Sequence, residues 1–156
     1  MVLEKDFREF IALLNEKGVK YLVIGGFAVN FHGYPRYTKD IDFWIWLTPE
    51  NIQKLLTAIN DFGFGSLKLN ETDFSDPGNI IQLGYEPNRI DLLVEVEGID
   101  FEKCYERREL REIDDTKVSF ISLQDLIDAK LNAGRLQDLA DADHLKKISA
   151  RKGRKK

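Results

Sequence analysis

The stretch of sequence that decides the fold is GGFAVNFHGYPRYTKDID, residues 25–42. Immediately before it, Tyr21 to Ile24 form a short, continuous apolar run that stops at two glycines, which is typical of a buried strand that ends in a bend. Residues 27–32 resume a helical pattern, and Ile41 to Leu47 have the β-branched and aromatic content of a strand. The sequence therefore predicts a strand, a diglycine bend, a short helix and a second strand.

The second strand begins with two carboxylates, Asp40 and Asp42. In an extended strand these side chains project from the same face, with Cα atoms about 6.5–7 Å apart. The other face is apolar and is predicted to be buried; it consists of Ile41, Phe43, Ile45 and Leu47. Two like charges at this spacing repel by on the order of 2–3 kcal/mol at an effective dielectric near 20. Such a pair indicates either a solvated strand or a site for a hard cation such as Mg²⁺.

A third carboxylate, Asp91, lies in a later apolar segment. Within Arg89-Ile90-Asp91-Leu92-Leu93-Val94, the isoleucine, the leucine at 92 and the valine share one face, and Asp91 stands on the other. If this strand lies beside the Asp40–Asp42 strand, three carboxylates converge, and two divalent ions about 4 Å apart would offset their repulsion. The alternative is that Asp91 is a strand residue in an ion pair with Arg89.

Gly25 and Gly26 complete the candidate site. They stand between a predicted buried strand and a helix, where backbone N–H groups and the helix N-terminus attract anions. Glycines also allow phosphate oxygens to approach the main chain closely. A phosphate cradle next to a carboxylate cluster suits in-line displacement at a phosphoryl group. Taken alone, a diglycine is more often a simple turn.

The remaining segments predict an α+β fold, a mixed sheet flanked by helices. The capping residues Thr48 and Ser122 open two of the helices. Helices are expected at 5–17, from Pro49 to about Phe62, and from 123 to about Ile148 with an interruption at Gly134; strands are expected at 80–85, 89–96, 107–113 and 117–121, and a loop at 63–79. We expect residues 1–150 to form a single domain and residues 151–156 to be a basic, disordered tail.

Composition limits the classes of function. The charged N-terminus does not match a secretory signal, no run reaches the roughly 20 apolar residues of a membrane span, and Cys104 has no cysteine partner. A cytoplasmic protein is therefore expected. Net charge is −4, and removal of the five cations in residues 151–156 leaves −9, which does not suit a protein that coats a nucleic-acid duplex. RNA binding through the basic tail stays an alternative.

The chain resembles the minimal nucleotidyltransferases of the polymerase β-like superfamily. Their pattern is Gly-Gly or Gly-Ser, about a dozen residues, Asp-x-Asp, and a third Asp on a later strand; here thirteen residues separate Gly26 from Asp40. Residues 25–42 look like a bacterial and archaeal branch related to abortive-infection and toxin–antitoxin nucleotidyltransferases. The similarity extends to residues 126–130 and 134–141, and covers about 20–147.

The resemblance implies a nucleotidyltransferase fold and transfer of a nucleoside monophosphate from an NTP, with ATP as the expected donor and Mg²⁺ or Mn²⁺ as the cofactor. By position, Asp40, Asp42 and Asp91 would bind the metals, and Asp91 would help deprotonate the acceptor hydroxyl. Gly25 and Gly26 would hold the terminal phosphates. Many members have Ser where this chain has Gly26, so we expect either a lower affinity for triphosphate or binding through other groups, for which the candidates are Arg36, Thr38, Lys130 and Arg135. Arg36 and Lys130 are equally good candidates for ion pairs with carboxylates.

Several other residues have two possible interpretations. Tyr34, Tyr37, Trp44 and Trp46 are candidates for stacking on a base, but aromatic residues in a small domain usually pack in its core. His32 is expected to cap a helix and His144 to lie on a helix surface. The acceptor is a protein, an RNA or a small molecule that meets the enzyme directly or in a homodimer cleft. The alternative function is a non-catalytic nucleotide- or protein-binding partner in a toxin–antitoxin type system.

Overall fold

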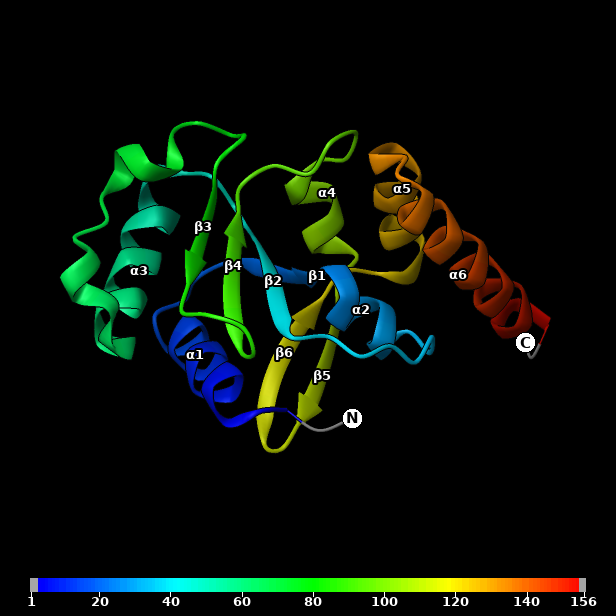
Figure 1. Ribbon diagram of the computed structural model, residues 1–156, viewed down its shortest axis with the longest axis horizontal. Helices are drawn as coiled ribbons and strands as arrows, with labels where there is room; N and C mark the ends of the chain where they lie inside the picture. The colour runs from blue at the N-terminus through cyan, green and yellow to red at the C-terminus, as the bar shows by residue number, and fades with distance from the viewer. Residues whose placement is uncertain (1–2, 155–156) are drawn as a thin grey trace.

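One mixed sheet runs through the molecule, and the computed structural model describes residues 3–154 of the chain (Figure 1). Within these residues the sheet has six strands in the order β3-β4-β2-β1-β6-β5. Their bounds are β1 (Tyr21–Ile24), β2 (Asp40–Ile45), β3 (Ile80–Leu83), β4 (Arg89–Leu93), β5 (Glu109–Ile113) and β6 (Thr116–Phe120). The pairs β1–β6 and β2–β4 are parallel, and the other neighbours are antiparallel. The predicted α+β fold with a mixed sheet is confirmed.

The helices lie on both faces of the sheet and beyond one of its ends (Figure 1). Their bounds are α1 (Lys5–Glu16), α2 (Gly25–Phe31), α3 (Pro49–Ile59), α4 (Phe101–Glu106), α5 (Leu123–Ala133) and α6 (Leu136–Arg154). A π-helical turn (Asn60–Phe64) spans the end of the predicted helix and the start of the predicted loop, and two 3-10 turns (Gly65–Leu67 and Glu71–Phe74) occupy part of that loop.

The predicted helix starts are confirmed where a side chain caps the backbone. Thr48 Oγ1 accepts a hydrogen bond of 3.2 Å from the Asn51 N–H, and Ser122 Oγ accepts one of 3.1 Å from the Asp125 N–H. These bonds satisfy N–H groups that a helix leaves without an internal partner. By contrast, α2 begins at Gly25 and not at residue 27, so the two glycines form its first turn.

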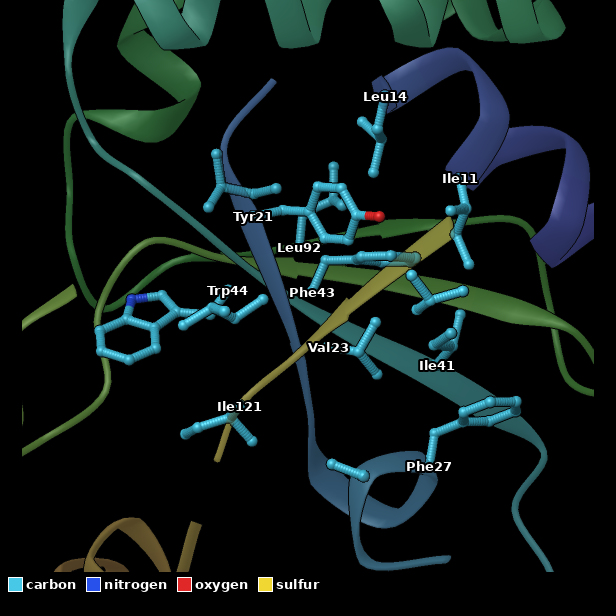
Figure 2. Packing of buried hydrophobic residues seen from close by; sticks show 14 of the residues in the cluster. Ile11, Leu14, Tyr21, Val23, Phe27, Ile41, Phe43, Trp44, Leu92 and Ile121 are labelled. Atoms are coloured by element: carbon cyan, nitrogen blue, oxygen red, sulfur yellow. The ribbon is translucent and has the colours of Figure 1, made fainter. Parts of the chain in front are cut away.

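One face of the sheet packs against α1 and forms the main core (Figure 2). Ile11 and Leu14 of α1 point toward Tyr21 and Phe43 in the central strands, and all four side chains are buried. The Phe10 and Phe43 rings meet edge to face with centroids 5.5 Å apart. Burial of such large apolar side chains contributes about 1.5–3 kcal/mol each. This packing holds β1 and β2 in place beneath the site described below.

The opposite face of β2 is covered only in part. Trp44 lies on the same side of the strand as the two aspartates, and it is buried against Phe101 of α4 with centroids 5.2 Å apart. The half of the strand that carries Asp40 and Asp42 is partly exposed. The prediction that Leu47 belongs to the buried face is wrong: β2 ends at Ile45, and Leu47 is 41% exposed in the following loop.

The helices α5 and α6 form a hairpin, and α6 extends away from the sheet (Figure 1). Gly134 ends α5 with φ of +72°, a backbone conformation that suits glycine. α6 continues through Arg154, and it therefore includes four of the six residues expected to form a disordered tail; Lys155 and Lys156 lie outside the described residues. Among residues 3–154, no helix is both long enough and apolar enough to cross a bilayer. The cytoplasmic location and the single-domain boundary stay predictions.

Candidate metal and nucleotide site

The parallel pairing of β2 with β4 brings the three predicted carboxylates together. Asp42 lies opposite Asp91 in the register, and Asp40 lies opposite Arg89. One carboxylate oxygen from each of Asp40, Asp42 and Asp91 lies within 4.8 Å of the others. We call these three residues the carboxylate cluster. Their roles as metal ligands and catalytic groups stay predictions.

Arg89 is the basic partner within this cluster. Its Nε donates to Asp91 Oδ1 at 2.7 Å, and its Nη2 donates to Asp91 Oδ2 at 3.0 Å and to Asp40 Oδ2 at 2.7 Å. The hydrogen bonds to Asp91 raise the pKa of the guanidinium, and the charges of the nearby carboxylates act in the same direction. The ion pair that was the alternative interpretation of Asp91 is therefore present, and it coexists with the cluster.

Asp42 is the least compensated carboxylate of the three. Burial, together with the charges of Asp40 and Asp91, raises its pKa to about 7, although Lys130 acts in the opposite direction. Burial and the charge of Asp91 also raise the pKa of Asp40. Three hard oxygen donors that repel one another at this range match what divalent cations such as Mg²⁺ prefer. The donor set therefore fits a divalent metal.

Gly25 allows the main chain to approach the cluster. Its φ is +69°, and a Cβ at this position would collide with Asp42 Oδ2. A side chain is therefore excluded by both backbone conformation and space. Gly26 is different: its φ is ordinary, and a Cβ would lie 3.5 Å from Thr38 Oγ1, at normal contact distance. Only the first glycine of the pair is sterically required.

A pocket of about 410 Å³ adjoins the cluster. It brings together residues from the diglycine bend, the loop before β2, the turn before β4 and the α5–α6 hairpin. Its lining consists of Gly25, Gly26, Arg36, Tyr37, Thr38, Lys39, Asp40, Asp42, Glu86, Lys130 and Arg135. All five residues that the sequence predicts to bind the nucleotide lie in this lining, together with Arg135, the remaining candidate for triphosphate binding.

Two buried aspartates of α6 form ion pairs with three of the four cations of the pocket. Asp141, which is 0% exposed, accepts from Arg36 Nη1 at 2.5 Å and from Gln137 Nε2 at 2.8 Å, and it lies 3.0 Å from Lys130 Nζ. Asp138 accepts from Arg135 Nε at 2.7 Å and lies 3.4 Å from Lys130 Nζ. We call the two aspartates with Arg36, Lys130 and Arg135 the helical ion-pair cluster.

The cations of this second cluster outweigh the cost of burying its acids. Burial alone would raise the pKa of Asp141, but hydrogen bonds from Lys130, Gln137 and Arg36, together with the Lys130 charge, bring it below its usual value. Burial is likewise overcome at Asp138, mainly by the Arg135 hydrogen bond and the Lys130 charge, and its pKa is also lowered. Arg36 and Lys130 thus act as ion-pair partners while they line the pocket.

The comparisons with known proteins agree with this geometry. A family model described as nucleotidyl transferase of unknown function (DUF2204) matches residues 3–156. The chain belongs to this family. A comparison with curated proteins gives no match. The abortive-infection and toxin–antitoxin branch within the superfamily stays a prediction.

Solved structures of nucleotidyltransferases have the same fold. A lincosamide antibiotic adenylyltransferase (LnuA), lincomycin-bound, is 17% identical, with 94% of this chain and 98% of that chain covered and a TM-score of 0.55. A putative nucleotidyltransferase from Thermotoga maritima is 16% identical over 92% and 90% of the two chains, with a TM-score of 0.57. An antigenic nucleotidyltransferase-like protein from Paracoccidioides brasiliensis is 17% identical over 95% and 78%, with a TM-score of 0.52. At these identities the likeness shows the nucleotidyltransferase fold.

Two of the residues predicted to contact the nucleotide in this family member lie in the loop before β2. The Thr38 hydroxyl lines the pocket and donates to the Asp40 carbonyl oxygen at 2.7 Å, so it already stabilises the start of β2. Tyr37 lines the same pocket with its side chain 81% exposed. The other aromatic candidates are engaged elsewhere: Trp44 is buried, Tyr34 stacks on His144, and Trp46 stacks on Phe101.

The two histidines and the cysteine pack against other parts of the fold and lie outside the pocket. His32 is buried at the C-cap of α2, its Nε2 lies 2.7 Å from the Ile121 carbonyl oxygen, and burial lowers its pKa. His144 stacks on Tyr34 with centroids 4.2 Å apart, a contact that the sequence does not indicate. Burial raises the pKa of the Cys104 thiol to about 11. None of the three residues lines the pocket beside the carboxylate cluster.

Proposed function

We propose that the protein transfers a nucleoside monophosphate from an NTP, with ATP as the expected donor, to a hydroxyl acceptor by a two-metal mechanism. The observation that carries the proposal is the convergence of the three carboxylates within 4.8 Å beside a pocket lined by two glycines and four cations. Family membership supports nucleotidyl transfer as the reaction class. The acceptor is a protein, an RNA or a small molecule.

The chain supplies binding, alignment and charge. Gly25 and Gly26 let the terminal phosphates approach the main chain, and Arg36, Thr38 and Lys130 contact phosphate oxygens from the walls of the pocket. Asp40 and Asp42 would hold the divalent ions, and Asp91 would complete one of the two sites. Mg²⁺ or Mn²⁺ bound there would neutralise charge on the phosphates and lower the pKa of the acceptor hydroxyl.

The bond changes are those of an in-line displacement. The acceptor oxygen forms a bond to the α-phosphorus, the bond from the α-phosphorus to the oxygen that bridges to the β-phosphate breaks, and pyrophosphate leaves. Asp91 accepts the proton of the acceptor hydroxyl. Asp91 is buried, with 6% of the residue exposed, and its surroundings keep the carboxylate fixed beside the reacting groups.

Tyr37 is the best placed aromatic residue for contact with the base. Its side chain is free to solvent and lines the phosphate pocket, whereas the other three aromatic candidates pack against protein. Stacking of a base on an aromatic ring contributes about 1–3 kcal/mol and tolerates different bases. We therefore assign Tyr37 to the base, with no strong discrimination between nucleotides.

The test is a transfer assay with α-³²P-labelled NTPs, Mg²⁺ or Mn²⁺, and a cell lysate that supplies acceptors. The wild-type chain is expected to label an acceptor, and Asp91→Asn is expected to lose that activity while it stays folded. Asp125→Asn is the matched control, because Asp125 is also a buried aspartate with a two-point arginine contact, from Arg107, but it is not a member of the carboxylate cluster.

Equal transfer by wild type and Asp91→Asn would refute the assignment. Co-purification of a tight protein partner, without transfer by the wild-type chain, would instead support the non-catalytic role in a toxin–antitoxin type system. Truncation after Ala150 is expected to leave transfer unchanged, because residues 151–153, the part of this segment whose side chains the structure describes, do not line the pocket.

A further inference from the structure

Arg89 occupies the carboxylate cluster in an unusual way. Its fork engages both oxygens of Asp91, and one of the same nitrogens also reaches Asp40 on the neighbouring strand. A third nitrogen, Nη1, lies 3.4 Å from Glu86 Oε1 in the turn before β4. Two of the three proposed metal ligands are therefore already neutralised in part by a side chain of the protein itself.

The backbone fixes Arg89 in this position. It is the first residue of β4, it lies opposite Asp40 in the parallel register, and it shares a face with Asp91 two residues later. The turn before it is anchored because the Asn88 N–H donates to the Lys39 carbonyl oxygen at 2.6 Å. The side chain is only 23% exposed. Arg89 is thus a built-in component of the site, unlike a surface arginine that meets an acid by chance.

The charge of Arg89 cannot be removed by deprotonation, because a guanidinium stays protonated in proteins. A divalent ion that binds Asp40 and Asp91 must therefore approach a permanent positive charge within a few ångströms, or displace it. Either event weakens cation binding. The negative charge of a triphosphate in the adjoining pocket would offset that repulsion, since Arg36, Lys130 and the diglycine bend line the same cavity as Asp40 and Asp42.

We propose that Arg89 is a resident counterion that competes with divalent cations for Asp40 and Asp91, and thereby makes tight cation binding depend on the nucleotide. The inference rests on the proposed function, because it concerns the same carboxylates. It adds an order of binding: without nucleotide the arginine neutralises the cluster, and the metals bind tightly together with the triphosphate.

The first experiment measures Mn²⁺ affinity without nucleotide, from the electron paramagnetic resonance signal of free Mn²⁺. Arg89→Gln is expected to bind Mn²⁺ about tenfold more tightly than wild type, because one positive charge beside a divalent ion has been removed. Arg89→Lys keeps the charge but cannot bridge both aspartates, and an intermediate affinity is expected. The lysine variant also keeps the proposal testable if the glutamine variant fails to fold.

Arg107→Gln provides the matched control. Arg107 also contacts a buried aspartate at two points, with Nε 3.0 Å from Asp125 Oδ2 and Nη2 2.9 Å from Asp125 Oδ1, but this aspartate lies outside the carboxylate cluster. Its replacement is expected to leave Mn²⁺ affinity unchanged. A similar gain in Arg107→Gln would show a general effect of net charge and would overturn the proposal.

The second experiment repeats the titration with a non-hydrolysable ATP analogue. The analogue is expected to tighten Mn²⁺ binding to wild type by a larger factor than to Arg89→Gln, because the variant has lost the charge that the triphosphate offsets. Equal factors, or Mn²⁺ binding to Arg89→Gln that is no tighter than to wild type, would overturn the counterion proposal alone. Absence of Mn²⁺ binding to wild type even with the analogue would overturn the proposed function as well.

Discussion

The carboxylate cluster and the helical ion-pair cluster face the same pocket with opposite charge balances. The carboxylate cluster has three acids, Asp40, Asp42 and Asp91, and the one arginine that bonds to them, Arg89. The helical cluster has two acids, Asp138 and Asp141, and three bases, Arg36, Lys130 and Arg135. The pKa values of Asp40 and Asp42 are raised, whereas those of Asp138 and Asp141 are lowered.

The first cluster is a site that requires bound cations, whereas the second is a scaffold that presents its own cations to an anion. In the first cluster the protein leaves part of the negative charge uncompensated, and external cations can provide the missing positive charge. In the second, buried acids hold cations at the wall of a pocket, with one positive charge in excess for an anion. A metal–triphosphate complex has the matching charges for both.

The largest expected effect comes from removing a carboxylate from the first cluster. Asp42→Asn is expected to reduce nucleotidyl transfer by roughly a thousandfold or more, because a metal ligand is lost. The same variant is expected to raise the free energy of unfolding of the metal-free chain, because the carboxylate with the least compensation has been removed. Transfer assays and urea denaturation measure the two effects. A marked loss of stability would contradict the charge balance that we assign to this cluster.

Removing a carboxylate from the second cluster is expected to have the opposite effect on stability. Asp141→Asn leaves Arg36 and Lys130 without their shared acid, and it should lower the free energy of unfolding by about 3–5 kcal/mol, the usual cost of breaking a buried ion pair. Asp143→Asn is the control on the same helix, because its bridge to Lys147 is exposed and should contribute less than about 1 kcal/mol. Similar urea midpoints for both variants would contradict the structural role of Asp141.

Acid should weaken the second cluster selectively. Because the pKa values of Asp138 and Asp141 are lower in the folded chain than in the unfolded chain, where an aspartate titrates near about 3.9, their pairs stabilise the fold fully above that value. This stability is lost as pH falls through the lower, folded pKa. Between about pH 5 and 2 the wild-type chain should therefore lose more unfolding free energy than Asp141→Asn. Parallel losses in urea titrations would show that Asp141 does not contribute.

The smallest expected effect sharpens the role of the diglycine. Gly26→Ser places a hydroxyl where a Cβ meets only ordinary contacts with Thr38, so it should fold normally and lower the KM for NTP by a few-fold, about the value of one hydrogen bond. Gly25→Ala is the contrasting variant, because its Cβ would collide with Asp42 at a backbone φ of +69°. It should abolish transfer. Equal behaviour of the two variants would contradict the different constraints on the two glycines.

The sequence could predict the first cluster because strands alternate. Two-residue spacing puts Asp40 and Asp42 on one face, and the apolar neighbours of Asp91 place it on the corresponding face of β4. The register that sets Asp42 opposite Asp91 depends on how β2 and β4 pair, and it becomes visible only in the fold. The start of α2 at Gly25 was also hidden, because a positive φ is a property of the backbone and not of the residue type.

The second cluster could not be predicted from spacing alone. Asp138 and Asp141 lie three residues apart on α6, a spacing that is equally common on a solvated helix face. Their burial arises because α5, α6 and the loop before β2 pack together, and the paired cations come from the loop before β2, from α5 and from the turn between α5 and α6. Trp44 shows the same limit: it shares a face with the aspartates, yet Phe101 of α4 covers it.

The most direct test of the central claim is anomalous diffraction from crystals grown with Mn²⁺ and a non-hydrolysable ATP analogue. We predict two manganese peaks about 4 Å apart, with oxygen ligands from Asp40, Asp42 and Asp91 and with the triphosphate against Gly25 and Gly26. Manganese elsewhere on the chain, or a nucleotide bound without manganese at these three carboxylates, would contradict the account.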